Sequence, residues 1–179
     1  MTRIAALSEL EVAERLALEA EAIFWANAAT QSFATDAARA AYRELWFSRY
    51  LQHFPELLLV ALGDDGHAAG YLAGSRVSDA PPLTGPDYYR HFPRGLIEAY
   101  PAHIHVNIRA DRQGRLLGER LIGAFRRTCM SDALGGFHAV TAADSRAAHF
   151  FSKCGLAPLE EAEWNGRRIA FLGERIAPL

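Results

Sequence analysis

Cysteine and lysine are scarce in this chain of 179 residues. The two cysteines, Cys129 and Cys154, stand apart and show no Cys/His spacing typical of a metal module. A disulfide framework and a zinc module are therefore not expected, and a reducing compartment is favoured. Lys153 is the one lysine, so arginines supply most of the positive charge. With 19 basic and 21 acidic residues the formal net charge is -2, which gives no excess positive field for nucleic acid or an anionic membrane.

Long apolar runs are also missing. No stretch of about 20 residues is apolar and free of charge, so no membrane-spanning helix is expected. The first apolar run is too short for a signal peptide, and Glu9 and Glu11 follow it. Half of the residues are hydrophobic and 22% are charged, which is ordinary for a globular protein. We expect a single domain over residues 1–179, cytoplasmic, monomeric or homodimeric, without a nucleic-acid or membrane partner.

Helical patterns come first along the chain. Ser8 and Glu11 have the spacing of a capping box, and apolar residues then recur at helical intervals, which predicts a helix over 8–28. Asp36 can cap a second helix, and Pro55 ends it.

The hydrophobic period then changes. The continuous apolar run at 57–62 predicts a strand buried on both faces, and the turn at 63–66 joins it to a second strand over 68–77. Residues 78–99 are rich in proline, glycine and aromatic residues, which predicts a long ordered loop with one or two helical turns. Such a loop can act as a lid on a substrate.

From residue 100 strands and helices alternate. We expect strands over 103–110 and 137–142, helices over 113–130 and 144–154, and a closing hairpin of strands 156–159 and 168–174 around Asn165-Gly166. These elements predict a mixed α/β (α+β) fold, with a central, mostly antiparallel sheet and helices on both faces.

The turn at Gln113-Gly114-Arg115-Leu116-Leu117-Gly118 opens a helix, where free N–H groups and the positive end of the helix dipole can meet an anion. No Gly-Lys-Ser/Thr follows, which argues against a nucleoside-triphosphate P-loop. The turn also lacks the Gly-x-Gly-x-x-Gly pattern of a Rossmann dinucleotide site.

Together with the preceding strand and the stretch 144–151, this turn resembles the GNAT superfamily of acyl-CoA-dependent N-acetyltransferases. The stretch 100–107, Tyr-Pro-Ala-His-Ile-His-Val-Asn, is similar to bacterial acetyltransferases related to the histone-acetyltransferase-like domain attached to O-GlcNAcase. The resemblance is sharp over about 100–158 and looser over 55–77. It implies a GNAT-like sheet with splayed parallel strands, acetyl-CoA as cosubstrate, and no metal.

The resemblance also implies where coenzyme A binds. Its pyrophosphate would lie at the turn with Gly114, where Arg112 and Arg115 add positive charge. Strand 106–110 would diverge from strand 137–142 and expose main-chain groups to the pantetheine arm. The cofactor-binding residues implied are Ile108, Arg109, Ala110, Gln113, Gly114, Arg115, Leu116, Leu117, Gly118, Asp144, Ala147, Phe150 and Phe151.

Two residues depart from the family pattern. Leu116 stands where the family has the inner glycine of the loop, and a side chain there could crowd the phosphates. Phe151 stands where the family commonly has a tyrosine that protonates the departing thiolate, and phenylalanine has no proton to give.

Polar side chains alternate along the strand before the loop. His103, His105 and Asn107 share one face of it and could form a polar floor under the acetyl group. Hydrogen-bonded structural groups in a buried sheet are an equally open interpretation, and a metal site lacks a clear third ligand. In the catalytic interpretation His105 is the candidate base, with His103 or Glu98 as partner.

The sequence thus leaves two functions open. In the first, an amine attacks acetyl-CoA directly in a ternary complex, and a strand N–H near Ile108 holds the oxyanion. Asn107 and Tyr100 would contact the acceptor, which would enter between the loop 78–99 and the histidine face. Acidic residues in and beside that loop would suit a cationic amine: Asp79, Asp87 and Glu98. In the second, the chain is a non-catalytic acyl-CoA-binding or sensing module.

Overall fold

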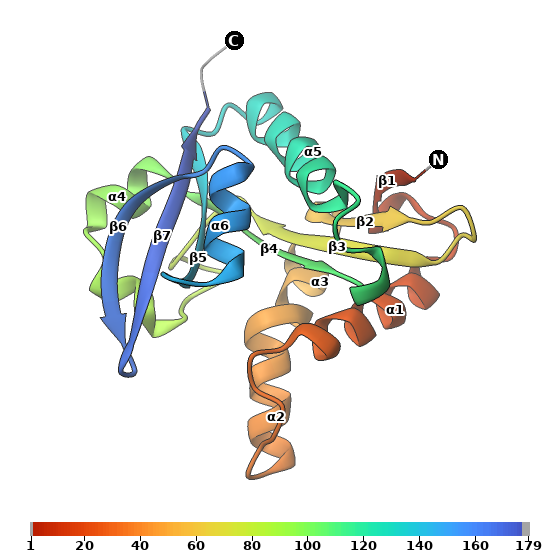
Figure 1. The fold of residues 1–179 in the computed structure, drawn as a ribbon, viewed down its shortest axis with the longest axis horizontal. Helices are drawn as coiled ribbons and strands as arrows, with labels where there is room; N and C mark the ends of the chain where they lie inside the picture. The colour runs from red at the N-terminus through yellow and green to blue at the C-terminus, as the bar shows by residue number, and fades with distance from the viewer. Residues whose placement is uncertain (1, 177–179) are drawn as a thin grey trace. The chain divides into compact units, whose positions relative to one another are not determined.

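The computed structural model describes residues 2–176 (Figure 1). The chain divides into two compact units. Unit 1 comprises the residues up to Gly74 together with His105–Phe125, and unit 2 comprises Ser75–Ile104 together with the residues from Arg126 on. The expectation of one domain over 1–179 stays a prediction.

Unit 1 contains the helical N-terminal region, a three-stranded antiparallel arrangement and parts of two further elements. Strand β1 pairs antiparallel with β2, and β2 pairs antiparallel with β3. The elements are β1 (Arg3–Ala6), η1 (Leu7–Glu9), α1 (Ala13–Asn27), α2 (Asp36–Arg43), a π-helical turn η2 (Glu44–Ser48), α3 (Arg49–His53), η3 (Pro55–Leu57), β2 (Leu58–Leu62), β3 (Ala68–Ser75), the end of β4 (Ala102–Ile108), η5 (Ala110–Arg112) and the start of α5 (Leu117–Ser131).

The first helix is shorter than the sequence predicted. α1 begins at Ala13, because η1 occupies the residues after β1, and Ser8 makes no capping hydrogen bond. Its buried side chains recur at the expected helical spacing: Leu16, Ala20, Ile23 and Phe24. Strand β1 was not expected, since four residues beside a helical pattern carry little period-2 signal.

The second helix is capped by Thr35 and not by Asp36. The Thr35 hydroxyl accepts a hydrogen bond from the backbone N–H of Ala38 at 3.1 Å. The helical segment ends before Pro55, as predicted, but the π-helical turn η2 lies within it. The predicted hairpin of β2 and β3 is confirmed, and Leu57 to Ala61 are buried.

Unit 2 contains the long loop and the C-terminal elements. Strand β5 pairs antiparallel with β7, and β7 with β6; β4 pairs parallel with β5 at Ala102↔Phe137 and His103↔His138. Its elements are η4 (Asp87–His91), α4 (Arg94–Ala99), the start of β4, the end of α5, β5 (Gly136–Ala142), α6 (Arg146–Lys153), β6 (Ala157–Trp164) and β7 (Arg167–Arg175). The two helical turns expected in the loop are η4 and α4.

The closing hairpin, coloured blue in Figure 1, is confirmed at its turn and longer than predicted in its first strand. Asn165 has φ 51° and Gly166 has φ 70°, the left-handed conformations that a two-residue hairpin turn requires. β6 extends to Trp164, because β7 pairs with it along its length. The sequence underestimated β6 because most of its residues are exposed, and Glu160, Glu161 and Glu163 interrupt its apolar pattern.

Two helix starts in the second half differ from the prediction. α5 begins at Leu117 and not at Gln113. α6 is capped by Ser145, whose hydroxyl accepts from the N–H of Ala148 at 3.1 Å, while Asp144 is not the capping residue. Gly155, with φ 99°, follows the end of α6 as predicted.

Across the described residues the strand order is β1-β2-β3-β4-β5-β7-β6, and β3, β4 and α5 each contribute residues to both units. The predicted mixed, mostly antiparallel α/β fold with a parallel pair is confirmed. Within residues 2–176, no helix combines the length and apolar character needed to cross a membrane.

Candidate acetyl-CoA site

The loop before α5 has a backbone shape suited to an anion. Gly114 has φ 74° and Leu116 has φ 59°, so two left-handed residues flank Arg115. The N–H of Arg120 bonds to the carbonyl of Leu116 at 3.0 Å, so the amides of the first helical turn before it lack intrahelical acceptors. Backbone N–H groups in such alternating turns, at the positive end of a helix dipole, form anion-binding concavities.

Leu116 keeps the conformation that glycine would adopt freely. Its side chain is 62% exposed, so packing against the protein does not explain the left-handed backbone. A Cβ built on Gly114 meets no atom within 4 Å, which leaves open space above the loop.

The expected cofactor residues of unit 1 form two short runs, 108–110 and 113–118. The Ile108 carbonyl accepts from the side-chain amides of Asn27 at 3.5 Å and Gln113 at 3.4 Å, so Gln113 folds back onto the end of β4. Leu117 and Gly118 are buried, whereas Ala110 is exposed.

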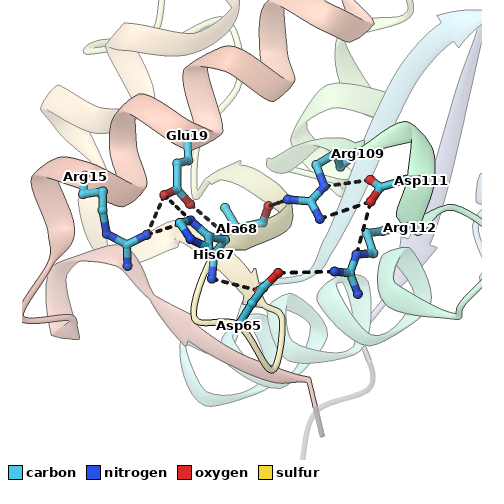
Figure 2. A network of polar contacts seen from close by, with 8 residues as sticks. All are labelled: Arg15, Glu19, Asp65, His67, Ala68, Arg109, Asp111 and Arg112. Carbon is cyan, nitrogen blue, oxygen red and sulfur yellow. Dashed lines mark hydrogen bonds and ion pairs between the residues drawn. The ribbon is translucent and has the colours of Figure 1, made fainter.

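The arginines around the loop differ in their freedom (Figure 2). Arg109 makes two hydrogen bonds to Asp111, at 2.7 and 3.2 Å. Arg112 pairs with Asp65 at 3.3 Å and with Asp111 at 3.5 Å. Arg115 is exposed beside the loop. Arg112 and Arg115 were both expected to supply mobile positive charge, but Arg112 is held by the carboxylates of Asp65 and Asp111.

The remaining expected cofactor residues lie in unit 2. Asp144 is exposed and pairs with Arg168 at 3.0 Å. Ala147 and Phe150 are half-buried on α6, and Phe151 is buried. Divergence of the strands beyond the paired residues of β4 and β5 stays a prediction.

His105 is held by aromatic side chains of unit 1. Its Nε2 lies 2.9 Å from the Tyr50 hydroxyl, and the rings of Trp46 and Tyr50 each meet the imidazole edge-on at 5.4 Å. Burial, with the nearby Arg49 charge as a second cause, lowers the pKa of His105 to about 4. The imidazole is therefore neutral at pH 7.

Sequence reasoning missed these neighbours of His105. Trp46 lies in the π-helical turn η2, and Arg49 and Tyr50 follow at the start of α3. Their spacing predicted a helix, but no local pattern indicates a π-helical turn. Such turns are frequent at functional sites.

Asn107, expected to contact the acceptor, donates from Nδ2 to the Tyr71 hydroxyl at 2.9 Å. Burial raises the pKa of Tyr71, so this phenol stays protonated. In unit 1 Asn107 thus satisfies a buried hydroxyl.

His103 lies in unit 2 and is buried. The Ser78 hydroxyl donates to the Pro101 carbonyl at 2.8 Å, so its oxygen accepts from Nδ1 of His103 at 2.7 Å. Nearby in sequence, the buried Tyr100 packs its ring against Phe171. The contacts of His103 fit its structural interpretation, while the acceptor contact of Tyr100 stays a prediction.

The acidic residues expected to attract a cationic amine each have a partner within unit 2. Glu98 is exposed and pairs with Arg94 at 3.2 Å. Asp79 accepts from the Gly85 N–H at 3.3 Å, and Asp87 accepts from Trp164 Nε1 at 2.7 Å. Within residues 2–176, no group of three or more His, Cys, Asp or Glu side chains is placed to hold a metal ion.

No family model and no curated protein sequence matches the chain. Solved structures do. The structure named SsHAT is 20% identical with a TM-score of 0.71, and the match covers 98% of each chain. The NatC complex bound to Gag peptide and CoA is 11% identical with a TM-score of 0.67, and the match covers 98% of this chain and 99% of that chain. An N-acetyltransferase from Staphylococcus aureus Mu50 is 16% identical with a TM-score of 0.57, and the match covers 99% of this chain and 98% of that chain. At these identities the likeness is one of fold: the chain has the fold of the GNAT N-acetyltransferases.

Proposed function

We propose that the protein is an acetyl-CoA-dependent N-acetyltransferase in which a primary amine attacks the thioester directly in a ternary complex. The observation that carries the proposal is the loop with left-handed Gly114 and Leu116, which leads into the free N–H groups at the start of α5. The fold supports it, and one structure of similar fold was solved with CoA. A cytoplasmic location and a monomeric or homodimeric state belong to the same proposal.

In this proposal unit 1 binds the cosubstrate. The N–H groups at the start of α5 receive the pyrophosphate, and Arg115 adds positive charge. Main-chain groups near Ile108 hold the pantetheine arm and the oxyanion of the tetrahedral intermediate. The unit 2 candidates Asp144, Ala147, Phe150 and Phe151 stay predictions, as do the acceptor contacts of Asn107 and Tyr100.

The acceptor must lose a proton before it attacks. A histidine with a pKa of about 4 is neutral at pH 7 but a weak proton acceptor. We therefore expect His105 to orient the acceptor, while the proton passes to water as the neutral amine forms. His103 and Glu98 are engaged with Ser78 and Arg94, which favours neither as the base.

The departing thiol needs no acid at alkaline pH. Phe151 cannot donate a proton, but a thiol of pKa about 8.5 leaves readily as the thiolate. Turnover should therefore rise with pH toward that value.

The test adds a negative charge at the loop. Gly114→Asp should weaken acetyl-CoA binding, measured by calorimetry, at least about tenfold through repulsion of the pyrophosphate. Gly166→Asp is the matched control, because Gly166 has a similar φ of 70° and equally open space, but lies in the β6–β7 turn. Equal affinity of the two variants would place the site elsewhere.

A non-catalytic acyl-CoA-binding module is the second candidate. Phe151 in place of a proton donor and the weakly basic His105 favour it. The two candidates separate in a screen of amines with detection of released thiol: binding of acetyl-CoA without thiol release from any amine selects the module.

A further inference from the structure

A network of ion pairs and hydrogen bonds in unit 1 joins three segments that are distant in sequence. Figure 2 shows side chains of α1, of the β2–β3 turn and of η5 linked in one network. Its members are Arg15, Glu19, Asp65, His67, Ala68, Arg109, Asp111 and Arg112.

Glu19 anchors the β2–β3 turn to α1. One carboxylate oxygen lies 2.5 Å from Arg15 Nη1 and 2.8 Å from His67 Nδ1, and the other accepts from the Ala68 N–H at 2.7 Å. Burial raises the pKa of Glu19, but these hydrogen bonds outweigh it and hold the pKa below its usual value. The carboxylate is thus ionised, and the turn has a fixed position on the helix.

Asp65 and Asp111 connect that turn to η5. Asp65 accepts from the His67 N–H at 3.1 Å with one oxygen and meets Arg112 at 3.3 Å with the other. Asp111 binds Arg109 and Arg112, and the backbone N–H of Arg109 donates to the Ala69 carbonyl at 3.0 Å. Hydrogen bonding from the His67 N–H lowers the pKa of Asp65, and hydrogen bonding from Arg109 lowers that of Asp111.

The segment held in this way leads directly into the candidate phosphate loop. η5 ends at Arg112 and buries no residue, so apolar packing does not fix it. The loop residues that follow are exposed from Gln113 to Leu116. On its N-terminal side the loop therefore depends on polar contacts for its position.

We propose that Asp65, through Arg112 and Asp111, is a positioning residue that fixes η5 and thereby orders the loop Gln113–Leu116 for the phosphates of acetyl-CoA. The inference rests on the proposed function for its ligand. It does not require Asp65 to touch the ligand.

The direction in which acetyl-CoA affinity changes separates a positioning role of Asp65 from a simple electrostatic one. Asp65→Asn removes a negative charge near the loop, which by itself would strengthen binding of a polyanion. The amide oxygen still accepts from the His67 N–H, so the turn itself is retained. Weaker binding can then arise only from lost positioning.

The experiment compares wild type, Asp65→Asn and Asp111→Asn with the control Glu14→Gln, an exposed acid on α1 with the same charge change. Hydrogen exchange of the amides of Arg112 and Gln113, which donate to the carbonyls of Arg109 and Ala110, is measured without ligand. The Kd is measured with acetyl-CoA by calorimetry, and the steady-state constants for acetyl-CoA are measured with an amine that the thiol-release screen identifies. We expect both aspartate variants to exchange faster and to raise Kd and KM about fivefold, with kcat retained and Glu14→Gln unchanged.

Unchanged exchange at Arg112 and Gln113, or unchanged or tighter acetyl-CoA binding in Asp65→Asn, would overturn the inference while leaving the proposed function intact. A wild-type protein that does not bind acetyl-CoA would instead refute the proposed function. The exchange measurement then still decides whether Asp65 orders the loop.

Discussion

Replacing Leu116 by glycine should stabilise the protein, although it removes a large apolar side chain. Leu116 has φ 59°, and a left-handed conformation costs a residue with a Cβ roughly 1–2 kcal/mol. The side chain is 62% exposed, so its removal forfeits little burial. Glycine's greater conformational freedom in the unfolded chain offsets about 0.4–1 kcal/mol of this stabilisation. The net expectation is a gain of about 0.5–1 kcal/mol.

Thermal unfolding without ligand measures this gain. For a chain of this size the expected rise in Tm is about 1–4 °C. Leu116→Ala is the matched control, because alanine loses the side chain but keeps the Cβ and hence the strain. Equal Tm values for the glycine and alanine variants would show that strain at Leu116 is not the cause, and a lower Tm for Leu116→Gly would refute the reasoning outright.

Two further variants test the electrostatics of unit 1. Since burial lowers the pKa of His105 to about 4, His105→Gln should leave the shape of the pH profile of kcat/KM unchanged between about pH 5 and 8. If the variant instead loses an ionisation near about pH 6.5 that the wild type shows, His105 is the base. Arg43 donates two hydrogen bonds of 2.6 Å to Glu21, and these lower the pKa of Glu21 below 4.5. The pair therefore stabilises the fold above pH 4.5, and this contribution is lost as the pH falls through the lowered pKa. Glu21→Gln should therefore lower the free energy of unfolding by about 1 kcal/mol at pH 7 and by progressively less below pH 4, measured by urea unfolding; a difference that stays constant with pH would contradict this account.

Periodic and turn-forming residues let the sequence predict most elements. The apolar run of β2, the Asn165-Gly166 turn and Gly155 after α6 act through local rules, because each depends on few neighbouring residues. The succession of elements and the loop Gln113–Gly118 then led to the correct fold class.

Helix starts were predicted less well. Ser8 and Asp36 have the right chemistry for caps, but whether a side chain reaches a free N–H depends on the backbone path into the helix. At α2 Thr35 takes that place, because its extended backbone precedes the helix and its hydroxyl reaches the N–H of Ala38.

The features of the candidate site likewise divide into those that local sequence predicts and those that depend on tertiary contacts. The sequence by itself determined that a turn with Gly114 opens a helix, because glycine placement and helix polarity are local properties. Only the tertiary structure decided that Leu116 keeps a left-handed backbone, that Arg112 is bound to Asp65, and that His105 is neutral beside Arg49 and Tyr50. Ion pairing and pKa values depend on groups that the chain brings together from distant positions, and no local pattern encodes those distances.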